Sequence, residues 1–171
     1  GEGAAVENPE ALLDERTGQI TLGASSPCVL RNHGGRAAVL LDFGFELHGG
    51  VEIMVWACGG SGNSARIRVR CGESAMEAMS EIGPGLTATN DHAVRDQELD
   101  VTFLGAHEAG STGFRFVRLD LLGDQGRLEL KSVRAVFLYR DLDYRGQFQC
   151  SDPRLQSIWY TGAYTVHLNM Q

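Results

Sequence analysis

Alternation of apolar and polar residues with a period of two is the feature that most restricts how this chain can fold. In residues 65–71, ARIRVRC, an apolar residue stands at every second position. The same period recurs in residues 51–57, VEIMVWA. Successive side chains of a strand point to opposite faces of a sheet, so each segment predicts a strand with one buried face. The residues expected on the solvent side of the first segment are Arg66, Arg68 and Arg70.

Further segments have strand-like composition, and glycine-rich turns separate many of them. They are QITL (19–22), CVLR (28–31), RAAVLLDFGFELHGG (36–50), ELDVTFL (98–104), FRFVRLDLL (114–122) and RLELKSVRAVFLY (127–139). Short strands without intervening helical patterns are typical of antiparallel sandwiches and jelly rolls. We therefore predict an all-β domain, an antiparallel β-sandwich or jelly roll, over residues 19–149. A polar surface segment at 1–18 precedes it.

Charge and cysteine content exclude some classes of partner. The 171 residues carry a net charge of −7 without a cluster of Lys or Arg, which argues against nucleic acid. No run approaches the roughly 18 apolar residues of a membrane span. The cysteines have no CxxC spacing, so we expect free thiols and favour a reducing, cytoplasmic compartment over a periplasmic or secreted one. They are Cys28, Cys58, Cys71 and Cys150.

Residues 150–171, CSDPRLQSIWYTGAYTVHLNMQ, have a helical pattern instead. Asp152 can cap the first turn, and Pro153 stands where its missing N–H costs nothing. Apolar residues then recur at helical spacing, which predicts a helix over 153–171. Its apolar face is expected to form an interface through Leu155, Ile158, Trp159 and Val166.

The connection at 72–97 is longer than an ordinary hairpin loop, and such loops in compact domains are usually functional or disordered. We expect an ordered loop that contacts a carbohydrate or a neighbouring domain. Its candidate residues are Asn90, Asp91, His92, Arg95 and Asp96. The acidic and histidine side chains could bind Ca²⁺. Because Asx residues in loops mostly hydrogen-bond to nearby backbone, we favour no metal and no cofactor.

Three residues of the strand-like region are further candidates for carbohydrate binding or a domain interface. His48 precedes two glycines, and Glu46 is nearby. A lone His there is usually a hydrogen-bonding residue, because catalysis would need an acid or a nucleophile within reach. Trp56 could stack on a sugar or lie beneath a neighbouring domain. The sequence contains no GxSxG or HExxH motif, so it predicts no active site of its own.

Several stretches resemble one family, the bacterial α-L-rhamnosidases of glycoside hydrolase family 78, over residues 36–171. They are LLDFGFELHGGVEI (40–53), RIRVRCGES (66–74), TNDHAVRD (89–96), TGFRFVRLDLL (112–122) and YRGQFQCSDPRLQSIWYTGAYTVHLNMQ (144–171). The resemblance implies the β-sandwich that precedes the catalytic domain of such a hydrolase. The segment 150–171 would then be the first helix leading into an (α/α)₆ barrel, whose remaining helices would cover its apolar face.

The resemblance also implies where catalysis occurs. The catalytic acid and base, which act with inversion, lie downstream of Gln171 in such enzymes, with carboxyls roughly 6.5–9.5 Å apart. No carboxylate of this segment matches that motif, so no catalytic residue is expected here. The implied function is a non-catalytic accessory sandwich of an enzyme that cleaves terminal α-L-rhamnosides; the alternative is an independent carbohydrate-binding module. The expected partners are a downstream helical catalytic domain, rhamnose-containing carbohydrate and a second copy bound through the exposed helix.

Overall fold

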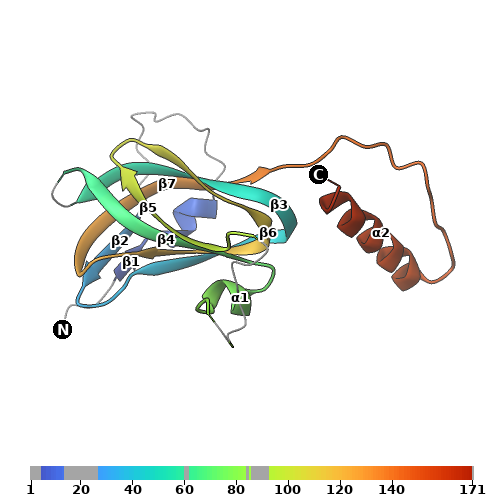
Figure 1. Cartoon of the computed structure of the whole chain (residues 1–171), viewed down its shortest axis with the longest axis horizontal. Helices are drawn as coiled ribbons and strands as arrows, with labels where there is room; N and C mark the ends of the chain where they lie inside the picture. Colours follow the sequence, from blue (N-terminus) through green and yellow to red (C-terminus); the bar gives the residue numbers. More distant parts are fainter. Residues whose placement is uncertain (1–4, 14–26, 60–61, 84, 86–92, 171) are drawn as a thin grey trace.

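A computed structural model describes residues 5–13, 27–59, 62–83, 85 and 93–170. The elements in chain order are β1 (Ala5–Glu7), η1 (Pro9–Leu13), β2 (Cys28–His33), β3 (Ala38–Gly59), β4 (Ser64–Gly72), α1 (Ala75–Met79), β5 (Asp96–Thr102), β6 (Ala106–Leu121), β7 (Gln125–Phe137) and α2 (Pro153–Leu168). Strands dominate, and α2 stands apart from them at one end (Figure 1). The predicted all-β antiparallel sandwich with a C-terminal helix is confirmed.

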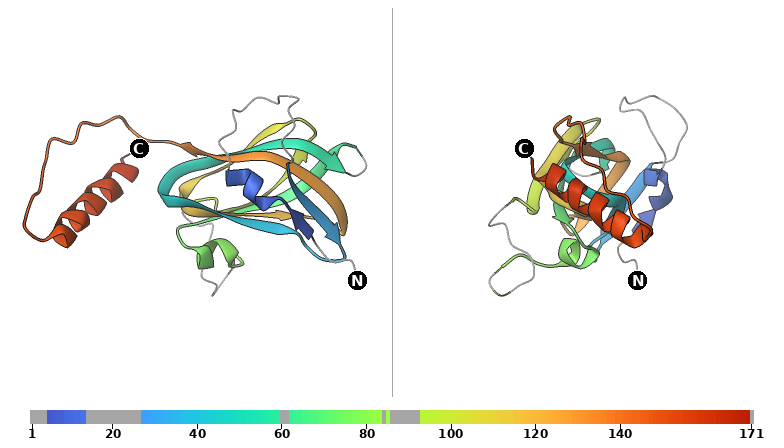
Figure 2. Two further views of the ribbon diagram at one scale, coloured as in Figure 1. Left: turned by 180° about the vertical axis from the view of Figure 1, so that it is seen from behind. Right: turned by 90° about the vertical axis from the view of Figure 1, so that its right-hand side faces the viewer.

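The strands pair antiparallel in the order β1-β2-β7-β3-β6-β4-β5. They curve around a common core, as the views from behind and from the helix end illustrate (Figure 2). Residues 5–13, which we expected on the surface, contribute β1, which pairs with β2, and the buried side chain of Ala11. The segment 19–22 lies outside the described residues.

The two strands predicted at 36–50 and 51–57 form one long strand, β3. It pairs with β6 on one side and β7 on the other. Its pairing with β6 shifts register between Asp42 and Leu47, and again between Gly49 and Gly50. These irregularities bend β3 at the end of the sandwich nearest α2 (Figure 1), because a bulge kinks a strand and increases its twist.

The apolar faces predicted from the alternation form the core. Val51, Ile53 and Val55 are fully buried, and Ile67 and Val69 of β4 join the same cluster. The predicted core faces of these two strands are therefore confirmed.

Arg70 contradicts the alternation. Its exposed fraction is 4%, so the prediction that it points to solvent is wrong. Its guanidinium donates to the buried Asp120 carboxylate at 2.8 Å, and Arg118 donates to the same carboxylate at 2.8 Å. Glu81, in the connection after α1, forms ion pairs with both Arg68 and Arg70. Residues 79–81 of the connection thus cover the second face of β4 at Arg70, and the ion pairs of Glu81 attach them to the sheet.

The helix α2 begins as predicted and ends earlier. Asp152 accepts a hydrogen bond from the Arg154 N–H at 2.9 Å, and Pro153 occupies the first turn. The helix ends at Leu168 with Asn169 as its C-cap, short of the predicted 171, because the Asn169 N–H closes a tighter turn onto the Val166 carbonyl. None of the described residues of α2 is buried.

Two other features of the described residues bear on the predictions. The thiols of Cys28, Cys58, Cys71 and Cys150 are all free. Burial raises the pKa of Cys71 to about 12, so this thiol is an apolar part of the core and a poor nucleophile. No described helix is both long and apolar enough to span a membrane.

Candidate functional site

A cleft of about 720 Å³ lies between the bent end of the sandwich and α2. The sandwich contributes residues 44–48 of β3 and 111–113 of β6. Helix α2 contributes Thr161, Tyr164 and Thr165 from the opposite side. Seen from the helix end, α2 lies across this end of the sandwich (Figure 2). The bend in β3 therefore creates one wall of the cleft, and the chain after β7 supplies the other.

Two carboxylates converge over a glycine in this cleft. A Cβ added at Gly113 would lie 3.2 Å from Oε1 of Glu46 and 3.7 Å from Oε1 of Glu73. Arg95 lies beside them: its guanidinium donates to the Gly113 carbonyl at 3.2 Å and to Glu73 at 3.3 Å. It also pairs with Glu77 at 3.2 Å. The absence of a side chain at Gly113 leaves the space that the carboxylates occupy.

The environment of Glu46 favours its neutral form. Burial, and after it the negative charge of Glu73, raise the pKa of Glu46 from its ordinary value of 4.5 to about 7. Arg95 opposes the shift, and Glu77 adds to it. A carboxyl that changes protonation near neutral pH inside a cleft can donate a hydrogen bond when protonated and accept one when ionised.

The rim of the cleft is held by an ion pair and by α2. The Arg115 guanidinium donates two hydrogen bonds to the Asp42 carboxylate, from Nε to Oδ1 at 2.7 Å and from Nη2 to Oδ2 at 2.8 Å. These hydrogen bonds lower the pKa of Asp42 to about 2. The Tyr164 hydroxyl of α2 donates to the Glu46 carbonyl at 2.6 Å. The backbone of Glu46 thus contacts the helix, while its carboxyl faces the other acids.

Replacing Glu73 with glutamine should lower the pKa of Glu46 from about 7 toward 4.5, because it removes a neighbouring negative charge. The pKa is measured by following the ¹³C shift of the Glu46 carboxyl against pH. Glu10→Gln in η1 is the control and should leave this pKa unchanged. An unchanged pKa in the Glu73→Gln protein would mean that the two carboxyls do not interact.

The raised pKa of Glu46 also makes the free energy of unfolding depend on pH. The pKa of Glu46 is raised in the folded protein, so the folded state binds this proton more tightly than the unfolded state does. The protonated Glu46 carboxyl therefore stabilises the folded state fully below about pH 4.5, and this stabilisation is lost as pH rises through about 7. A Glu46→Gln protein should lack this component of the pH dependence of unfolding.

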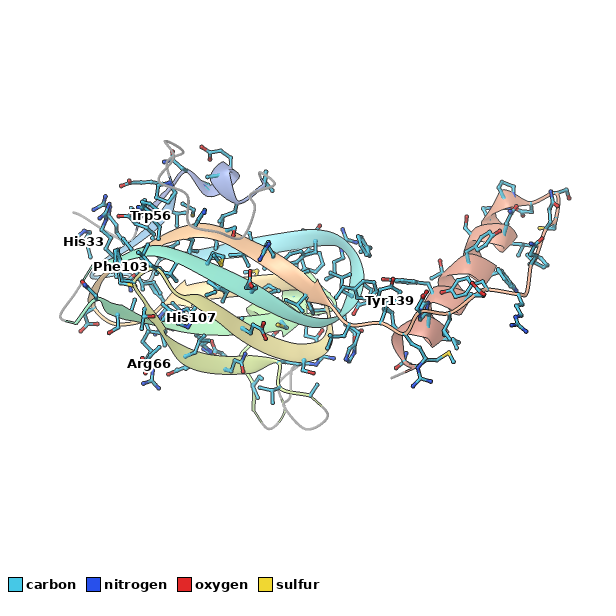
Figure 3. The ribbon with its side chains drawn as sticks, turned by 90° about the horizontal axis from the view of Figure 1, so that it is seen from above. His33, Trp56, Arg66, Phe103, His107 and Tyr139 are labelled. Carbon is cyan, nitrogen blue, oxygen red and sulfur yellow. The ribbon has the colours of Figure 1, made fainter. Side chains whose placement is uncertain are left out.

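The structure brings together some of the residues that the sequence singled out. Glu46, His48 and Arg95 all line the cleft. Asp96 is instead on β5, where Arg68 donates two hydrogen bonds to its carboxylate. Trp56 lies at the end of the sandwich away from α2, whereas Tyr139 lies beside the helix (Figure 3).

Asn90, Asp91 and His92 lie outside the described residues, so the alternative of a Ca²⁺ site there remains a prediction. Among the residues that are described, no group of three or more His, Cys, Asp or Glu side chains is arranged to hold a metal ion.

The sequence did not indicate that Glu73 and Tyr164 line the cleft, or that Glu77 pairs with Arg95 beside it. One signal was present: residues 74–77 read Ser-x-x-Glu, a pattern typical of a helix start. The structure has this turn as α1, where the Ser74 hydroxyl accepts from the Glu77 N–H at 3.1 Å. This capped turn positions Glu77 beside Arg95.

Three of the predicted interface residues of α2, Ile158, Trp159 and Val166, line one side of a second groove, of about 700 Å³, which α2 forms with the segment before it. Ile158 and Val166 are 66% and 61% exposed, and Leu155 of the same helix is also exposed. Trp159 is half-buried and stacks loosely on Phe148, with ring centroids 6.5 Å apart. The helix therefore presents an apolar face that the described part of the chain leaves open.

The segment between β7 and α2 is attached to the helix through His167. This ring donates from Nε2 to the Arg140 carbonyl at 2.5 Å, and its Nδ1 lies 2.7 Å from the Tyr144 hydroxyl. The Tyr139 ring also contacts the imidazole. These contacts fix α2 to its own connecting segment.

Comparison with known proteins shows a similarity of fold. No protein-family model matches the sequence, and a search of curated proteins finds no match. Among solved structures, the chain is similar to the crystal structure of a GH78 family rhamnosidase of Bacillus sp. GL1, with a TM-score of 0.55 and 19% identity. The similarity covers 94% of this chain and 15% of that one. This chain therefore has the fold of a small part of a larger multidomain enzyme.

Proposed function

We propose that this chain is the non-catalytic accessory β-sandwich of an α-L-rhamnosidase-like glycoside hydrolase. In the whole enzyme it supports and orients a downstream helical domain that hydrolyses terminal α-L-rhamnosides with inversion. The similarity of fold to part of a GH78 rhamnosidase supports this proposal. The observation that carries it is α2, a helix of 16 residues of which none is buried.

A helix of 16 residues gains little stability on its own. Isolated helices shorter than about 12–15 residues are marginal in water even when they are rich in alanine, and most helices in proteins are stabilised by burying an apolar face. The exposed side chains of Ile158 and Val166 would each contribute roughly 1.5–3 kcal/mol when buried. A helix of a downstream domain seated in the groove beside Gly162 would bury both. The small Gly162 allows a close approach, since no atom lies within 4 Å of where its Cβ would be.

The cleft has a supporting role in this proposal. Arg95, Glu73 and Glu77 already neutralise one another in part, so the charged groups are arranged to hold a defined surface. The connection that contains Arg95 contacts the catalytic domain near its linker or at the rim of the sugar site. The catalytic acid and base belong to the downstream domain, and Glu46 is not assigned to either role.

The test begins with the coding sequence after Gln171. We expect this sequence to encode a helical domain. The longer protein should hydrolyse an aryl α-L-rhamnoside, whereas the 171-residue chain should not hydrolyse it. In the longer protein, Ile158→Glu with Val166→Glu should lower the free energy of unfolding by about 3–6 kcal/mol, because two buried side chains become charged.

The control is Ser157→Glu, which changes an exposed neighbour on the same helix and should leave stability nearly unchanged. The double substitution should also have little effect in the 171-residue chain, where these side chains are exposed already. Turnover by the short chain, or a longer protein that tolerates both charges, would contradict the proposal. Binding of L-rhamnose by the short chain alone would instead favour an independent carbohydrate-binding module.

A further inference from the structure

The contact between α2 and the sandwich involves a residue that can change its charge. Tyr164 donates its hydroxyl to the backbone carbonyl of Glu46 at 2.6 Å. The carboxyl of the same Glu46 faces the cleft that Thr165 of α2 and the C-cap residue Asn169 also line. The helix is therefore seated over Glu46 by its C-terminal half. A negative charge on the Glu46 carboxyl acts electrostatically on Tyr164 in this part of the helix.

The sandwich surrounds Glu46 with more acidic than basic groups. Glu73 and Glu77 approach from the start of the 72–97 connection, and Arg95 approaches from its end. Arg95 is already shared between these two carboxylates, at 3.3 and 3.2 Å. Arg115 of β6 also acts on Glu46.

Neither arginine is available to neutralise Glu46 alone. Arg115 is held by two hydrogen bonds from its guanidinium to Asp42 of β3. His48 of the same strand lines the cleft as well. An ionised Glu46 would thus be an additional negative charge among carboxylates whose arginine partners are engaged.

Helix α2 adds a further negative contribution. The last turn of a helix carries a partial negative charge, because its carbonyl groups point out of the C-terminus. In α2 that turn, which ends at Leu168, lies at the cleft. Burial and, after it, the charge of Glu46 raise the pKa of the Tyr164 hydroxyl. The tyrosine therefore stays neutral and brings no positive charge that would offset an ionised Glu46.

We propose that the contact between α2 and the sandwich is a pH-sensitive latch, closed while the Glu46 carboxyl is protonated and opened when it ionises. Opening leaves α2 attached through the segment before it, to which His167 holds it. The latch sets how rigidly the helix is oriented on the sandwich. It depends only on residues of this chain, so it goes beyond the accessory-domain proposal and can be tested apart from it.

The pKa of Glu46 places the transition in an accessible range. That pKa is about 7 in the closed state, so the carboxyl is largely neutral at pH 5 and largely ionised at pH 8. Each unit by which the pKa differs between closed and open states changes the ratio of open to closed molecules about tenfold over the titration. We therefore expect this ratio to rise between about pH 5 and about pH 8, and the size of the rise measures how much of the pKa shift of Glu46 depends on the contact with α2.

The experiment follows amide chemical shifts of Thr161–Leu168 in the ¹⁵N-labelled 171-residue chain as a function of pH. The wild type should move between two end states, and ¹⁵N relaxation should report faster motion of α2 at the high-pH end. Glu46→Gln, which keeps the shape and removes the ionisation, should stay at the closed end throughout. Glu10→Gln, a matched change on η1, should titrate like the wild type.

Tyr164→Phe tests the contact itself, because it removes the hydroxyl that reaches the Glu46 carbonyl and leaves the carboxyl in place. This protein should be at the open end at both pH values. Titration that persists in Glu46→Gln would assign the change to another group, such as His48 or His167, and would overturn the proposal. So would a helix whose shifts and relaxation do not change with pH. Neither outcome depends on whether a downstream domain exists.

Discussion

Replacing Asp120 with asparagine should lower the free energy of unfolding by about 3–5 kcal/mol, the largest effect expected of any single charge in the sandwich. Asp120 has no exposed surface, and Arg70 beside it is 4% exposed. The substitution keeps the shape of the side chain but leaves the Arg70 guanidinium buried without its carboxylate. Glu81 contacts Arg70 from the surface and can compensate only in part, since its own side chain is 62% exposed. Urea-induced unfolding measures the loss.

The matched control is Glu98→Gln on β5. Glu98 pairs with Arg66 at 3.0 Å, but both side chains are largely exposed, so water screens the pair. Exposed pairs contribute about 0–1 kcal/mol, and the control should therefore unfold near the wild-type urea concentration. Equal losses from the two substitutions would mean that Asp120 is hydrated in solution and that the face of β4 beneath residues 79–81 is open.

A second large effect is expected at Gly49, where β3 turns from the cleft into its long pairing with β7. Its φ is +142°, and a Cβ there would overlap the carbonyl oxygen of Val136. Alanine would therefore force backbone to move in two strands, at a cost of about 3–5 kcal/mol. Thermal unfolding measures this loss. It should be accompanied by chemical-shift changes at Glu46 and His48, because the bend positions both residues.

The loss at Gly49 has two causes, the strain of a positive φ and the overlap with Val136, and a substitution at Gly44 distinguishes them. Its φ is also positive, at +87°, but no atom lies within 4 Å of where its Cβ would be. Gly44→Ala should cost only about 1–2 kcal/mol, the strain of the left-handed backbone without the overlap. If Gly49→Ala were no worse than Gly44→Ala, the close approach of β3 to Val136 would not exist in solution.

How far the sequence predicts this fold depends on which interactions are local. Alternation identified the buried faces of β3 and β4, because side-chain direction in a strand follows from position alone. It could not identify the burial of Arg70, because that burial depends on residues 79–81 covering the second face of β4. It also divided β3 into two strands, because glycines at a bulge resemble glycines at a turn.

The cleft was predictable only in part, for a similar reason. Glu46 and Arg95 could be selected as polar residues near strand ends or in a long loop. Their approach to Glu73 over Gly113 results from the pairing of β3 with β6, which no local pattern specifies. Tyr164 reaches Glu46 only because the segment after β7 returns α2 to the end of the sandwich (Figure 1). The start of α2 was predictable because capping by Asp152 and Pro153 is local.

The long strand β3 also determines the order in which the chain can fold. Ala38 pairs with Asp120 of β6, and Gly59 pairs with Arg127 of β7. Both edges of β3 therefore remain unpaired until these later strands have been synthesised. Pairing of distant segments makes folding slow, since loop closure has to precede the contacts. During synthesis, β3 emerges with two unsatisfied edges, which favours association with other chains or a chaperone. Once β7 has emerged both edges are paired, so the sandwich can be complete before any segment that follows α2 begins to fold.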